Sequence, residues 1–364
     1  MPVNEFTRRL CSSQAQALFA PMMPGINEIA QKVVESVRNM VSDPCYVGPR
    51  TLTVSWIPSN QLKANAATRG PNDHVISLAY GLASTAYKDA ALLYTLGSTH
   101  LVLDKYQELF SDLDYGQGPK QVLPIDLTPG SARDKFLSSS IAWVFLHEQA
   151  HLFQNHGVIF ANRTGQAIPF GHTDWVDDKQ GAKLTGDAAW IRHCFELSAD
   201  HEASVHSIGY LLVRDKGSLK RSSLWMLVAA VTCLFRHFYG EVRGPQSDSA
   251  TGSHPDSNVR ARTALSAMLN TLWHPDIRGC LAWAGTPDDI EKVMHHAFVT
   301  ANVYMQLVHF DPEQFPQFLL RLREDSPSRR AYEMGIKSMW DSLRPEVVAA
   351  HFGPEPENAM PAFD

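Results

Sequence analysis

The 364-residue chain has few cysteines, no long apolar run and no excess of basic charge, and each absence excludes a class of protein. A formal charge of −6 argues against a nucleic-acid partner. The longest apolar run, residues 224–235, is too short for an integral membrane segment, which needs about 20 residues. The cysteines are widely spaced without a C-x-x-C pair, which indicates reduced thiols in a cytoplasmic protein; they are Cys11, Cys45, Cys194, Cys233 and Cys280.

Histidine is abundant, with 16 residues, and the most informative motif is His147-Glu148-Gln149-Ala150-His151. It follows the apolar run 141–146, which predicts a buried helix. Residues four apart share one face of a helix, so both imidazoles can bind one Zn²⁺. Glu148 is turned about 100° from His147, so we expect it to reach a metal-bound water and act as a catalytic base. The alternative is two buried histidines that meet by chance.

A catalytic zinc needs a third protein ligand, and Glu196 is the best candidate. The region 188–214 is predicted to be helical, which places Glu196 and Asp200 on one face. Glu196 can bind the metal, while Asp200 can hydrogen-bond the far nitrogen of a zinc histidine. The alternative is an ordinary solvated helix face. The same helix offers three rival ligands, which are His193, His201 and Glu202.

His254 precedes Pro255, which holds its backbone extended at the end of a polar loop. The next helix can be capped by Asp256 or Ser257. Such a loop can bring the imidazole to the open side of the metal, where it would stabilise the oxyanion. Arg260 can orient this loop or bind substrate. The alternative is a surface turn followed by a solvated arginine.

The order of these motifs resembles that of the gluzincin zinc metallopeptidases, in particular the HtpX-like and CAAX-prenyl-protease-like family, and more remotely the phage-exclusion peptidase Lit. The central match is His147-Glu148-x-x-His151 followed by Glu196-x-x-Ala199-Asp200. Three weaker pieces accompany it: Asn65-Ala66 before a predicted strand, His156 five residues after His151, and His254-Pro255 followed by Arg260.

The resemblance implies a zinc-dependent endopeptidase with a protein or peptide substrate. Its metal ligands would be His147, His151 and Glu196, and Asp200 would support them. An alternative is a catalytically silent, peptidase-like module that keeps zinc and acts by binding a protein. Retention of Glu148 favours the enzyme, because a purely structural site has no use for a base.

The pattern of elements predicts an α+β, mainly helical zincin-type fold with a small antiparallel sheet. Residues 51–57 and 74–81 are its predicted strands, and the second could pair with an extended substrate. Pro129-Gly130 and Ser131 with Asp134 predict the start of a helix that runs to His156 and stops at Gly157. Three segments are expected: a helical arm (1–48), a metallopeptidase domain (49–275, with an insertion at about 92–129) and a helical C-terminal lobe (276–364), with helices near 288–309, 312–323 and 328–343.

Overall fold

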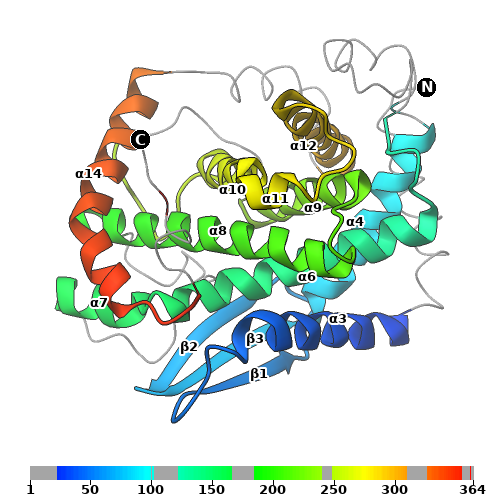
Figure 1. The fold of residues 1–364 in the computed structure, drawn as a ribbon. Coiled ribbons are helices and arrows are strands. Elements are labelled where there is room, and N and C mark those ends of the chain that lie inside the picture. The colour runs from blue at the N-terminus through cyan, green and yellow to red at the C-terminus, as the bar shows by residue number, and fades with distance from the viewer. Residues whose placement is uncertain are drawn as a thin grey trace.

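The computed structural model describes residues 23–99, 101, 122–165, 184–239, 248–309, 326–354 and 361. Within them the chain is mostly helical and forms a small three-stranded sheet, as expected for the α+β class. Figure 1 shows the sheet below a set of long helices. Helix α6 (Pro129–Phe153) packs against the sheet and also against α8 (Gly186–Arg214). The two helices that carry the predicted metal ligands are therefore direct neighbours.

The sheet contains β1 (Thr51–Ile57), β2 (Ala64–Gly70) and β3 (Asp73–Ala79) in the order β1-β3-β2. It is mixed and not antiparallel as expected, because β3 pairs antiparallel with β2 but parallel with β1. The two-residue link between β2 and β3 can join only antiparallel neighbours, and β1 then takes the other edge of β3. Since β3 is paired on both sides, the expectation that it binds a substrate backbone is wrong.

The other helices of the described part are α3 (Met23–Val37), α4 (Tyr80–Thr99), α7 (His156–Thr164), α9 (Arg221–Tyr239), α10 (Ser257–Trp273), α11 (Pro275–Arg278), α12 (Pro287–His309) and α14 (Pro327–Ala350), with a π-helical turn at Arg38–Ser42. Most of these helices pack against α6 or α8, whereas α12 packs against α9, α10 and α4, and α11 against α10. The first residues of the insertion expected at about 92–129 belong to α4. Residues 102–121 of this insertion lie outside the described residues. The helix expected at 312–323 also lies outside them. None of the described helices combines the length and apolar character needed to cross a bilayer.

Two groups of apolar side chains fill the interior. The larger joins α3, the sheet, α4, α6, α9, α10 and α12. The smaller lies between α7, the first half of α8 and α14. Trp143 and Trp225 are almost fully buried, as expected for core residues, whereas Trp190 is half-buried at the edge of the smaller group.

Helix α6 is buried from Phe136 to Phe153, including its polar residues. Thr128 is its N-cap and forms a capping box with Ser131, so the expected pairing of Ser131 with Asp134 is wrong. The helix ends at Phe153 and does not continue to His156. Asn155 adopts a left-handed conformation with φ of 53°, which asparagine tolerates better than most residues, and α7 begins directly after it. This turn brings His156 back toward the zinc motif.

Candidate metal centre

His147 and His151 meet on the face of α6 that is turned toward α8. Their Nε2 atoms lie 3.1 Å apart, and their ring centroids are separated by 4.7 Å. The exposed fractions are only 3% for His147 and 2% for His151. The one-turn spacing of the motif therefore places both ring nitrogens at a single buried point, as the sequence predicted.

Glu196 on α8 completes the group. Its carboxylate oxygens lie 3.6 Å from Nε2 of His147 and 3.7 Å from Nε2 of His151. Tetrahedral zinc with bonds of about 2.0–2.1 Å separates its ligand atoms by about 3.3 Å. The three side chains are therefore spaced as a bound zinc requires. Together they form a group able to hold a metal ion, which confirms this part of the prediction without identifying the metal.

The contacts of His147 determine which of its nitrogens carries the proton. Nη2 of Arg260 lies 3.3 Å from Nε2 of His147, and a guanidinium can only donate. Nε2 must therefore be an acceptor, and in the neutral ring the proton is on Nδ1. That nitrogen lies 3.0 Å from Oδ1 of Asp200, which favours a protonated Nδ1. Nε2, which lies close to His151 and Glu196, thus carries the lone pair that metal binding requires, and a bound ion would replace the contact with Arg260.

The tautomer of His151 follows from a chain of buried hydrogen bonds that begins at Gln154. Nε2 of Gln154 donates to Oε2 of Glu202 at 2.6 Å and to the carbonyl of Ser198 at 3.3 Å. Both partners only accept, so the amide oxygen must face the other way. There it accepts from the hydroxyl of Ser198 and lies 2.7 Å from Nε2 of His156. In neutral His156 the proton is therefore on Nε2.

The position of this proton on His156 determines the position of the proton on His151. Its Nδ1 carries the lone pair and lies 2.8 Å from Nδ1 of His151, which must donate. Nε2 of His151 is consequently an acceptor, like Nε2 of His147. The ring of His156 is held in place by stacking on Phe195, with centroids 4.1 Å apart and planes 10° from parallel. We call the chain His156, Gln154, Ser198 and Glu202 the relay.

Glu202 anchors the relay as a carboxylate. Burial by itself raises its pKa, but hydrogen bonds from His206 and His351, together with their charge, lower the pKa of Glu202 to about 2. It therefore remains an acceptor for Gln154 at neutral pH. Glu202 was expected as a rival ligand, and the relay was not predicted. Its signal in the sequence is the spacing of Ser198 and Glu202, one helical turn apart.

Arg260 lies deep in the same site and is not a solvated surface residue. It contacts both oxygens of Asp200, at 2.6 and 2.7 Å, and Oε2 of Glu196 at 3.0 Å. Its exposed fraction is 2%. Asp256, one of the two caps that the sequence offered, is the N-cap of α10, and this start places Arg260 toward α8. Arg260 therefore fixes the carboxylates of Glu196 and Asp200.

His254, just before α10, is brought to the edge of the site. Its Nε2 lies 4.0 Å from Oε1 of Glu196, and Nδ1 lies 2.8 Å from the hydroxyl of Ser253. Its side chain is 15% exposed, which makes it the most accessible member of the group. Glu148 is buried on α6 beside His147, with 1% exposed.

The rival ligand His193 does not belong to the group formed by His147, His151 and Glu196. Its Nδ1 is 2.7 Å from the hydroxyl of Tyr332. Burial, and secondly the neighbouring charge of His254, lowers the pKa of His193 to about 4. Cys194 packs in the smaller core and contacts the carbonyl of Ile336, as expected for a buried thiol.

Comparison of the chain with models of known protein families, with curated proteins and with solved structures finds no match.

Proposed function

We propose that the chain is a zinc-dependent peptidase of the gluzincin type, with His147, His151 and Glu196 as metal ligands. The supporting observation is the spacing of the ligand atoms: the two Nε2 atoms lie 3.1 Å apart, and oxygens of Glu196 lie 3.6 and 3.7 Å from them. The tautomers inferred above place a lone pair on each Nε2, and a shared cation would remove the repulsion between the two lone pairs. Two histidines and one glutamate are a ligand set of catalytic zinc, in which a water takes the fourth position.

Charge balance supports a divalent ion. The carboxylates of Glu148, Glu196 and Asp200 are at most 1% exposed, and Arg260 contacts two of them. Buried carboxylates are costly unless their charge is compensated, and a divalent cation at the ligand group would interact favourably with them.

The residues around the ligands fit hydrolysis of a peptide bond. Zinc bound here would lower the pKa of its water toward about 7 and polarise the substrate carbonyl. Glu148 would take the proton of the attacking water and pass it to the leaving amine. His254, at the more exposed edge, would donate a hydrogen bond to the oxyanion. Arg260 would act as a positioning residue for Glu196 and Asp200.

A second candidate is a peptidase-like module in which zinc only stabilises the fold. The burial of the ligands favours it, since His147, His151 and Glu196 are at most 3% exposed. The retained carboxylate of Glu148 beside the ligands favours the enzyme. Both candidates require the metal, and only the enzyme requires Glu148.

The first experiment measures zinc per chain by mass spectrometry of purified protein. His151→Ala and Glu196→Gln should each bind one zinc ion fewer per chain than the wild type, because each removes one ligand of this site. His274→Ala and Glu333→Gln change exposed residues outside the site and serve as matched controls that keep the metal. Full zinc occupancy in His151→Ala would place the metal elsewhere.

The second experiment maps new protein termini in cells that carry the wild type or Glu148→Gln. The amide is nearly isosteric with the carboxylate but cannot take a proton, so zinc should remain while cleavage falls by about 10²–10⁴-fold. Equal sets of termini from the two proteins, with zinc bound in both, would reject the peptidase and leave the binding module.

A further inference from the structure

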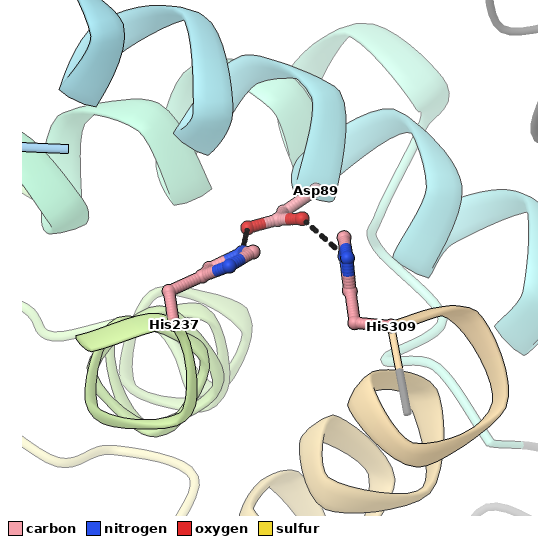
Figure 2. Close-up of side chains that lie close together, drawn as sticks. All are labelled: Asp89, His237 and His309. Carbon is pink, nitrogen blue, oxygen red and sulfur yellow. Dashed lines mark hydrogen bonds and ion pairs between the residues drawn. The ribbon is translucent and has the colours of Figure 1, made fainter. Parts of the chain in front are cut away.

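A second group of potential ligands joins three helices outside the first site. Asp89 of α4, His237 of α9 and His309 of α12 point toward one another, as Figure 2 shows. The two histidines follow Asp89 by 148 and 220 residues. The packing of the three helices alone brings them together.

The carboxylate of Asp89 lies between the two imidazoles. Nε2 of His237 is 2.6 Å from one oxygen, and Nε2 of His309 is 3.3 Å from the other. The ring centroids are 4.7 Å apart. The three ligand atoms all lie within 4.8 Å of one another, so they form a group able to hold a metal ion.

The carboxylate is held in a fixed orientation. Asp89 is only 2% exposed, and the hydroxyl of buried Tyr304 donates to Oδ1 at 2.7 Å. Tyr304 thus orients the carboxylate as groups behind metal ligands do.

We propose that Asp89, His237 and His309 bind a divalent transition-metal ion of borderline hardness, such as Zn²⁺, Fe²⁺ or Co²⁺, at a site independent of His147 and His151. Two histidines and one carboxylate form a set that binds these ions and leaves coordination positions open. Binding of the ion would displace the protons that the two Nε2 atoms share with the carboxylate, because a ligating nitrogen must offer its lone pair. Nε2 of His237 and its oxygen of Asp89 would then separate from 2.6 Å to about 3.3 Å, the spacing of ligand atoms on one zinc ion.

Access from solvent distinguishes this site from the first. The side chains of His237 and His309 are 16% and 32% exposed, while the side chain of His147 is 4% exposed. An ion can therefore reach the histidines directly. Because the ligands come from three helices, the bound ion would tie the end of α12 to α4 and α9.

Cobalt provides a direct test, since its visible spectrum reports coordination. Metal-free wild-type protein should bind two equivalents of Co²⁺ per chain in equilibrium dialysis. His309→Ala and His237→Ala should each retain only the Co²⁺ bound at His147 and His151. His151→Ala should retain only the Co²⁺ bound at Asp89. His295→Ala is the matched control, because it changes an exposed histidine of the same helix, and it should bind two.

Tyr304→Phe removes only a hydroxyl and keeps the test decisive if a histidine variant fails to fold. It should lower the affinity for Co²⁺ at Asp89 by about 10–100-fold and leave the affinity at the His147 site unchanged. The proposal is overturned if the wild type binds a single equivalent that His151→Ala abolishes, or if a folded His309→Ala still binds two. In either case the three residues are an ion-pair network that holds the helices together.

Discussion

Gln154 offers the sharpest test of how this chain prepares a metal ligand. Its amide fixes the proton on His156, and His156 in turn fixes the proton on His151. In Gln154→Met the amide is gone, so His156 can place its proton on Nδ1 and donate to His151. The proton of His151 then moves to Nε2, the atom that would bind zinc. We therefore expect zinc affinity to fall although no ligand has changed.

The magnitude follows from the contacts. Groups that orient metal ligands are worth about 10–100-fold in affinity, or about 1.4–2.7 kcal/mol. Gln154 also donates to the charged Glu202 and shares hydrogen bonds with Ser198 and His156. A hydrogen bond to a charged group contributes about 1.5–3 kcal/mol and a neutral one about 1. The free energy of unfolding without metal should therefore fall by about 3.5–5 kcal/mol.

Gln149→Met is the matched control. Gln149 is equally buried on the same helix, but its oxygen accepts from Ser42 and belongs to no part of the relay. This variant should lose about 1 kcal/mol of stability and keep its zinc affinity. Affinity would be measured by competition with a chelating dye, and stability by urea unfolding with a chelator present. Unchanged affinity in Gln154→Met, or equal weakening in both variants, would refute the role of the relay.

Three further predictions concern other parts of the site and the core. His254→Ala should lower kcat and kcat/KM together by about 10²–10³-fold without changing zinc content; loss of zinc would instead make His254 a ligand. Asp200→Asn should weaken zinc binding by about 10–100-fold and cost about 3 kcal/mol of stability, because it disrupts a buried pair with Arg260. Unchanged affinity in dye competition and unchanged stability in urea unfolding would contradict this role of Asp200. Burial lowers the pKa of His296 to about 3, and the indole of Trp225 donates to its Nδ1. The stabilisation by neutral His296 is therefore fully present above the unfolded pKa of about 6.5, and it falls by about 1.4 kcal/mol per pH unit as the pH decreases toward 3. In urea unfolding, the free energy of unfolding of His296→Gln should depend less steeply on pH over this range than that of the wild type.

The two metal groups differ in how far the sequence reveals them. His147 and His151 are recognisable because they share one helix, and helical geometry relates residues four apart without any knowledge of the fold. Glu196 required a second helix, and it was selected among three rivals through its spacing to Asp200. The group at Asp89 has no such signal, because its members stand alone on three helices.

Features that depend on neighbouring residues could be predicted from the sequence: the buried helix with its paired histidines, and a cap at Asp256 or the residue after it. The mixed pairing of β3, the burial of Arg260 against Asp200 and the relay behind His151 could not. The difference lies in the sequence separation of the residues involved. Backbone geometry places side chains one turn apart on the same face, whereas the proton on His151 depends on Glu202, which a separate helix brings within hydrogen-bonding distance of Gln154.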